Sequence, residues 1–124
     1  LAMILAVLET RCGLSFSGRD VYLSVAGGLR ITEPAADLAV AAALTSALAD
    51  VALPNRCVVF GEVALSGEVR AAGRSDLRLK EAKKLGFTQA FAPAQKRTGG
   101  ETGVKVHTVS HISELAARIT GAGA

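Results

Sequence analysis

Apolar residues recur with helical spacing in four segments of this chain, and proline, serine or glycine marks several of their ends. The segments are 1–11, Pro34 to about Asp50, Ser75 to Gly86, and about 113–119. Residues three or four positions apart share one face of a helix, so each segment can bury one side. Proline fits a first helical turn and serine fits an N-cap, which supports the starts of the two middle helices.

The helix that follows Pro34 is apolar on nearly all sides. Its apolar members include Leu38, Val40, Ala41, Leu44, Ala47 and Leu48. A helix without a polar face is usually buried from several directions. We therefore expect this helix in the centre of the fold, with helices or a sheet packed around it.

Alternating or β-branched runs between the helices predict short strands. They are 20–25, 57–63, a hairpin return over 63–71 with Gly67 near its turn, 90–92 and 104–109. A polar loop at 95–103 separates the last two. The order α-β-α-β-β-α-β-β-α predicts an α+β, or mixed α/β, fold in one domain over residues 1–120, with a flexible tail at 121–124.

The composition narrows the class of protein. The chain has 124 residues, of which 50% are hydrophobic, 20% are charged and only five are aromatic. This length suits one domain, and the apolar fraction is too high for a disordered chain. The scarcity of aromatic rings argues against a stacking platform for single-stranded nucleic acid.

The longest apolar runs are too short for membrane spans or signal peptides. They cover residues 1–8 and 38–49, whereas a spanning helix needs about 20 apolar residues. We therefore expect a cytoplasmic protein with no membrane partner, in which Cys12 and Cys57 are buried thiols rather than a disulfide. Because the sequence starts at Leu1 within a predicted helix, we also expect a piece of a longer protein.

Charge is divided unevenly along the chain. Residues 1–62 carry four basic and six acidic side chains, net −2, and residues 63–124 carry ten basic and five acidic, net +5. Six of the basic residues fall within fifteen positions: Arg70, Arg74, Arg78, Lys80, Lys83 and Lys84. They occupy a hairpin strand, a loop and the outer face of a helix that buries Leu79, Ala82 and Leu85. This stretch is either an ordinary solvated face or a surface for an anionic partner.

Motifs for other chemistry are missing. No phosphate-binding loop of the Gly-x-x-x-x-Gly-Lys-Ser/Thr type occurs. His107 and His111 are four positions apart but fall in a strand and at a helix start, so we expect no metal site. The serines lie in no recognisable nucleophile motif; the candidates are Ser15, Ser17, Ser66 and Ser75.

Two ordered blocks carry a family resemblance. They read AGGLRITEPAADLA at 26–39 and FGEVALSGEVR at 60–70, and residues 3–13 and 85–93 fit the same pattern. Together they resemble the C-terminal domain of the bacterial RadA (Sms) family, which is similar to the proteolytic domain of Lon proteases. The resemblance covers nearly the whole chain. It implies a Lon-like fold, shared with the second domain of a small-subunit ribosomal protein, in which helices cover a mixed sheet.

The chain departs from the Lon pattern at both catalytic positions. Lon-type peptidases carry the nucleophile in Gly-Pro-Ser-Ala-Gly, and here Ala35 stands at the serine. An ungapped comparison places Asp76 at the catalytic lysine, with Lys80 one helical turn later. A methyl group cannot attack a carbonyl, so we expect no peptidase activity. The alternative is an active peptidase with a relocated dyad, for example Ser66 with Lys80.

The resemblance also implies what the domain serves. RadA-like proteins join a zinc-binding segment and a RecA-like ATPase to this domain, form homo-hexameric rings and drive branch migration in recombinational DNA repair. ATP, Mg and Zn would then belong to those other parts, and this chain would hold no cofactor. We expect it to scaffold the ring and to contact DNA without sequence preference through the six basic residues. The alternative is an oligomerisation module that does not touch DNA.

Overall fold

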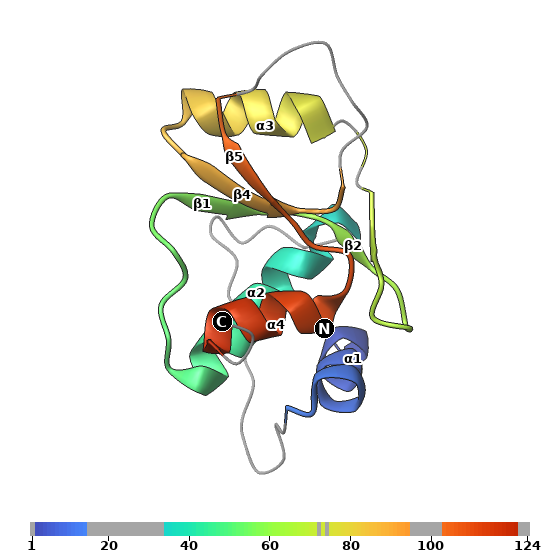
Figure 1. Ribbon diagram of the computed structural model, residues 1–124. Helices are drawn as coiled ribbons and strands as arrows, with labels where there is room; N and C mark the ends of the chain where they lie inside the picture. Colours follow the sequence, from blue (N-terminus) through green and yellow to red (C-terminus); the bar gives the residue numbers. More distant parts are fainter. Residues whose placement is uncertain (1, 15–33, 72, 74, 95–102, 122–124) are drawn as a thin grey trace.

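The computed structural model describes residues 2–14, 34–71, 73, 75–94 and 103–121, and the statements below concern these residues (Figure 1). The chain is a mixed α+β fold, as predicted. The helices are α1 (Ala2–Cys12), α2 (Asp37–Ala49), which a short 3-10 turn η2 (Pro34–Ala36) precedes, α3 (Ser75–Lys84) and α4 (Ile112–Thr120). The strands are β1 (Cys57–Val59), β2 (Glu62–Val63), β3 (Val69–Arg70), β4 (Gln89–Ala92) and β5 (Lys105–Thr108). The predicted strand at 20–25 lies outside the described residues.

Two small sheets organise the described strands. In the first, β4 lies between β1 and β5, and both pairings are parallel. In the second, β2 and β3 form an antiparallel hairpin whose turn contains Gly67 at φ +92°. Figure 1 shows α3 on one face of the three-stranded sheet and α2 and α4 on the other, with α1 beside α4.

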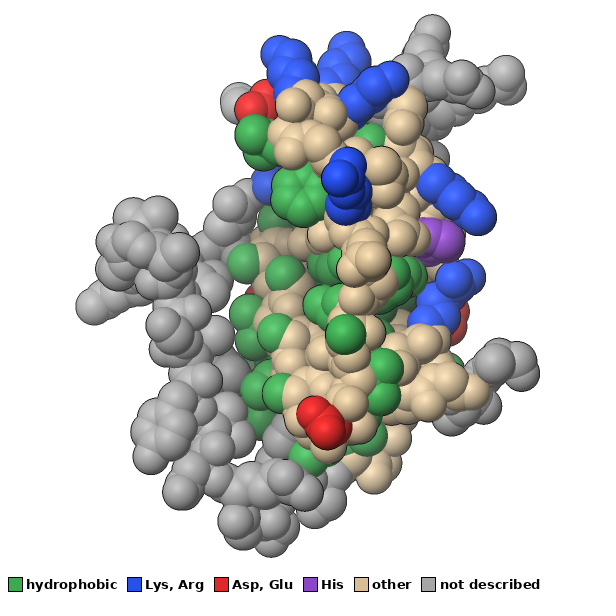
Figure 2. All heavy atoms as spheres, turned by 90° about the vertical axis from the view of Figure 1, so that its left-hand side faces the viewer, with side chains coloured by type: hydrophobic (Ala, Val, Ile, Leu, Met, Phe, Trp, Pro, Cys, Tyr) green, Lys and Arg blue, Asp and Glu red, His purple; other side chains and the backbone are tan. Residues whose placement is uncertain are grey.

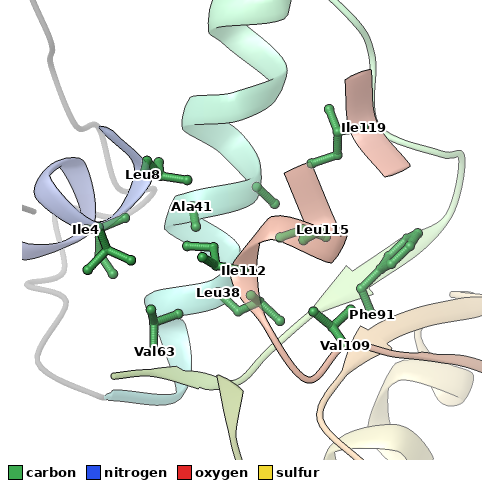
Figure 3. Packing of buried hydrophobic residues seen from close by; sticks show 12 residues of the cluster. Ile4, Leu8, Leu38, Ala41, Val63, Phe91, Val109, Ile112, Leu115 and Ile119 are labelled. Atoms are coloured by element: carbon green, nitrogen blue, oxygen red, sulfur yellow. The ribbon is translucent and has the colours of Figure 1, made fainter. Parts of the chain in front are cut away.

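Each face of the sheet has its own apolar core. The larger core lies among α1, α2, α4 and the sheet, and Figure 3 shows its side chains converging from these elements. Its fully buried members include Leu8, Leu38, Val109, Ile112 and Leu115. The smaller core lies beneath α3 and consists of Phe60, Leu79, Ala90, Ala92 and Val104.

Helix α2 is central, as its composition predicts. It contacts α1, α4, β1 and β2, and it buries Leu38, Ala41, Ala42 and Thr45. The buried hydroxyl of Thr45 donates to the Ala41 carbonyl at 2.8 Å, which satisfies that polar group within the helix. The burial is not complete, because Ala47 is exposed.

The predicted single strand over 57–63 is wrong, because the chain leaves the sheet at Gly61. The Gly61 N–H donates to the Ala35 carbonyl at 2.9 Å, and the Gly61 carbonyl accepts from the Leu38 N–H at 3.0 Å. These bonds hold the start of α2 against the chain and replace the strand ladder. Gly61 has φ +150°, a conformation that side chains disfavour, so the break falls at a glycine.

The predicted inner face of α3 holds for Leu79 and Ala82 and fails for Leu85, which is 69% exposed. The helix ends at Lys84, and Gly86 at φ +92° turns the chain away. Leu85 therefore sits in the terminal turn rather than against the sheet. Ser75 is predicted to be the N-cap of this helix, but it is the first helical residue, one position after the N-cap.

The two cysteines are free and half-buried. Burial raises the pKa of the Cys12 thiol. It also raises the pKa of the Cys57 thiol, where a backbone hydrogen bond acts in the opposite direction and lowers it less than burial raises it. Within the described ranges, no helix has the length and apolar character needed to cross a membrane.

Candidate nucleic-acid interface

The basic surface is built on α3, which the smaller core holds in place. Leu79 and Ala82 are buried against the sheet, so the residues between and after them point outward. Lys80, Lys83 and Lys84 are all exposed. Figure 2 shows Lys and Arg side chains gathered at the end of the molecule that α3 occupies. The structure thus brings together three of the six basic residues that the sequence singles out.

The other three candidates are placed differently. Arg78 is half-buried, and its Nε donates to the Gly73 carbonyl at 2.8 Å. Arg70 is exposed in β3, directly opposite Glu62 of β2 in the hairpin register. Arg74 lies outside the described residues. Among the described residues, the basic surface is therefore centred on α3 and does not extend over the whole 70–84 stretch.

The basic surface continues from α3 toward β5. A Cβ atom added to Gly103 would lie 2.2 Å from Nζ of Lys83, so this amine rests directly over the backbone of Gly103. Gly103 is two residues before β5, whose first residue, Lys105, is exposed. Lys83 therefore joins the surface of α3 to the start of the sheet's edge strand.

A chain of hydrogen bonds crosses from the sheet to α4. The Gln89 side-chain amide donates to the Asn55 carbonyl at 2.9 Å, and its Oε1 lies 3.0 Å from Nε2 of His107. The other ring nitrogen, Nδ1, lies 3.4 Å from Nη1 of Arg118. Arginine can only donate, so Nδ1 accepts and the Nε2–H donates to Gln89. The His107 ring also stacks on Phe91, with centroids 4.7 Å apart.

These contacts favour a neutral imidazole at His107. Burial lowers the pKa of His107, and the positive charges of Arg118 and Lys105 lower it further. The ring therefore remains an acceptor for Arg118 at neutral pH. Sequence reasoning missed this cluster. The spacing of Lys105 and His107 in one strand indicates that both side chains lie on the same face of the sheet. The contact between His107 and Arg118 depends on tertiary structure and leaves no pattern in the sequence.

A hollow of about 350 Å³ lies between the start of α2, β1 and α3. Its described lining is mostly apolar and comprises Ala35, Ala36, Ala39, Val58, Val59, Phe60, Arg78, Glu81, Ala82, Leu85 and Phe87. No serine, threonine, cysteine, lysine or histidine is among these residues. Ala35, where the sequence resemblance predicts the Lon nucleophile, is buried at the wall of this hollow. The described lining contains no nucleophile, and Asp76 is not part of it.

The relocated dyad is not assembled. Ser66 lies in the turn between β2 and β3, where its hydroxyl accepts from the Glu68 N–H at 3.3 Å. Lys80 is on α3, and Figure 1 shows that turn well away from α3. His111 lies beside the turn, with Nε2 3.1 Å from the Ser66 carbonyl. Its Nδ1 accepts from the Ser113 N–H as the N-cap of α4, so His107 and His111 belong to separate networks. Within the described residues, no group of three or more His, Cys, Asp or Glu could hold a metal ion.

Comparison with known proteins gives a consistent set of relatives. The DNA repair protein RadA of Brucella abortus is 54% identical over 125 residues, which span 100% of this chain and 27% of that protein. The DNA repair protein RadA of Rickettsia typhi is 55% identical over 91 residues, or 73% of this chain and 20% of the relative. That of Aquifex aeolicus is 48% identical over 114 residues, or 92% and 26%. The chain thus spans about a quarter of the length of these relatives. No family model matches it.

Proposed function

The chain belongs to the RadA family of DNA repair proteins, and we propose that it is a Lon-like domain without catalytic activity that serves recombinational DNA repair. In this proposal it contacts DNA without sequence preference and helps to hold a homo-hexameric ring together. ATP hydrolysis with Mg, branch migration and zinc binding belong to parts of the family that this chain does not span. The observation that carries the proposal is the exposed lysine surface of α3.

The chemistry of this surface suits phosphates. Lys80, Lys83 and Lys84 are compact positive charges on a helix that two buried residues fix against the sheet. Such charges bind the DNA backbone and release its counterions, which makes the affinity fall as salt rises. Lysines alone distinguish bases poorly, so the binding is insensitive to sequence.

The test measures fluorescence anisotropy of labelled duplex and single-stranded oligonucleotides with the 124-residue chain at several salt concentrations. The triple variant K80Q/K83Q/K84Q is expected to reduce the slope of log affinity against log salt by about 2.7 on duplex DNA, at about 0.9 per lost phosphate contact. R11Q removes one charge from exposed Arg11 at the end of α1 and is the control. Absence of DNA binding at low salt, or an affinity that the triple variant leaves unchanged, refutes the DNA contact.

The absence of peptidase activity is tested separately. Ala35 supplies only a methyl group where a Lon-type peptidase needs its nucleophile, and the described lining of the adjacent hollow offers no replacement. Casein and fluorogenic peptides are expected to remain intact with the wild-type chain. If the wild-type chain cleaves these substrates and S66A does not, the expectation is wrong and the alternative of a Ser66–Lys80 dyad is supported.

A second candidate, an oligomerisation module that does not touch DNA, is favoured by the exposed apolar side chains. Leu65 at the hairpin turn is 74% exposed, and Leu77 and Leu85 on and after α3 are 53% and 69% exposed. Apolar side chains in such positions suit contacts between copies of the chain. This candidate predicts a discrete hexamer by light scattering and no salt-dependent DNA binding.

A further inference from the structure

Three basic or polar groups line one edge of the molecule below α3. Lys105 and His107 are two positions apart in β5 and therefore point to the same face of the sheet. Their partners across the strand pairing, Gln89 and Phe91, also belong to that face. Arg118 approaches it from α4 through its contact with His107. Figure 2 shows Lys and Arg side chains on either side of a histidine along the edge that descends from α3.

The charge of Arg118 is not neutralised within the described part of the chain. Its partner there is the His107 ring, which accepts one N–H and leaves the other guanidinium donors available. The carboxylate one turn earlier, Glu114, is turned to the start of α4. Its two oxygens accept from the hydroxyl and the N–H of Ser110, at 2.5 and 3.4 Å. Lys105 likewise has no carboxylate partner among the described residues.

We propose that Lys105 and Arg118 form a second phosphate-binding site, which His107 positions, and that the DNA backbone runs from α3 across Lys83 to this edge. The inference rests on the proposed DNA contact and extends it. Lys83 provides the connection, because its amine lies over Gly103, two residues before Lys105. The ligand is a backbone phosphate, since Arg118 offers several N–H donors and Lys105 adds a point charge.

His107 acts here as a positioning residue. As a neutral acceptor it fixes Nη1 of Arg118, while its other nitrogen is tied to Gln89 of β4. The charged groups that face it are Arg118 from α4 and Lys105 from its own strand, and both disfavour the imidazolium. A phosphate bound between them offsets these charges. DNA binding is therefore expected to raise the pKa of His107 from its lowered value.

The chain contains two histidines, which makes this shift directly measurable. Ring-proton NMR titrations of the 124-residue chain are run with and without a short DNA duplex, and H107Q assigns the two signals. His111 caps α4 against the hairpin turn and serves as the internal control. We expect DNA to raise the pKa of His107 and to leave the ring-proton chemical shifts of His111, measured at fixed pH, unchanged. A bound complex in which His107 does not respond, or in which both respond alike, overturns the site.

Affinity measurements separate this site from the proposed function. R118Q and K105Q are each expected to weaken duplex binding about tenfold at 0.1 M salt and to lower the salt slope by about 0.9. R11Q, an equal loss of charge on an exposed residue of α1, is expected to have little effect. Thermal melting verifies that each variant is folded.

The outcomes are distinguishable. If K80Q/K83Q/K84Q weakens binding while R118Q and K105Q match R11Q, the edge site is refuted and the α3 surface stands. If the wild-type chain binds no DNA at low salt, both proposals fail. If inorganic phosphate at matched ionic strength shifts His107 as strongly as the duplex does, the edge is a site for free phosphate and the path of the DNA backbone is refuted.

Discussion

Gly61 is a position where a single added methyl group is expected to destabilise the fold. Its backbone joins the end of β1 to the start of α2 through bonds with Ala35 and Leu38. It has φ +150°, and an added Cβ would lie 3.0 Å from Cγ1 of Val69, 3.2 Å from Cδ of Pro93 and 3.3 Å from Cδ2 of Leu38. G61A therefore combines a disfavoured backbone conformation with a crowded site.

The magnitude follows from these two contributions. A side chain at such a φ costs about 1–3 kcal/mol, and overpacking a close-packed site costs about 1–3 kcal/mol more. Together the two contributions are expected to lower the free energy of unfolding by about 4 kcal/mol. At about 2.1 cal/mol/K per residue, a chain of 124 residues has an unfolding entropy of about 0.26 kcal/mol/K. The expected fall in Tm is therefore about 15 °C.

Two other glycines separate the contributions in the same thermal melts, followed by circular dichroism. Gly86 has φ +92° but nothing within 4 Å of an added Cβ, so G86A should lose about 1–2 kcal/mol, or about 4–8 °C. Gly73 has neither feature, so G73A should leave the Tm unchanged or slightly raised. A G61A variant no less stable than G86A would show that Gly61 is not crowded, and equal melts for all three would refute the reasoning entirely.

Three further predictions use the same measurements of stability. L79A removes a side chain buried beneath α3 and should cost about 2–4 kcal/mol in urea unfolding, whereas L85A, at an exposed position, should change stability by less than about 0.5 kcal/mol. H111A removes the N-cap acceptor of the Ser113 N–H and should lower the free energy of unfolding by about 1 kcal/mol, whereas H111N keeps an acceptor at the N-cap and should recover most of that loss. Because the pKa of His107 is lowered in the fold, its contribution to stability is present above pH 6.5, the ordinary value, and is lost as the pH falls below it. Melts at stepped pH should show this decline for the wild-type chain and a smaller one for H107Q.

The helices were predictable because their signals are local. The apolar spacing over 1–11 and 113–119 reports one face of a helix, and α1 and α4 match it closely. The all-round apolar composition after Pro34 also indicates the central position of α2, since few other environments accept such a helix. In these cases each residue's neighbours in sequence decide its structure.

The strand break at Gly61 could not be predicted because its cause is distant in sequence. β-branched content over 57–63 favours one strand, but the backbone groups of Gly61 bond to Ala35 and Leu38, more than twenty positions earlier. Leu85 was misplaced for a related reason. Its helical spacing points inward, but the helix ends one residue before it.

The candidate site was half predictable. The lysines of α3 share one helix, so their common face follows from the sequence. The cluster at the edge of β5 needs a strand, its neighbour and a helix together, since Arg118 meets His107 across 11 residues and two elements. A charge map along the sequence therefore finds the first group and misses the second.

The packing of α1 against α4 has a consequence for how the protein is made. These helices are separated by about a hundred residues, yet they share one core and lie side by side in Figure 1. During synthesis α1 leaves the ribosome about a hundred residues before α4, so its contacts with α2 can form early but its contacts with α4 cannot. Contacts this distant in sequence slow folding. The nascent chain thus leaves part of an apolar core exposed until α4 is made, and this period is when a chaperone would be of most use to it.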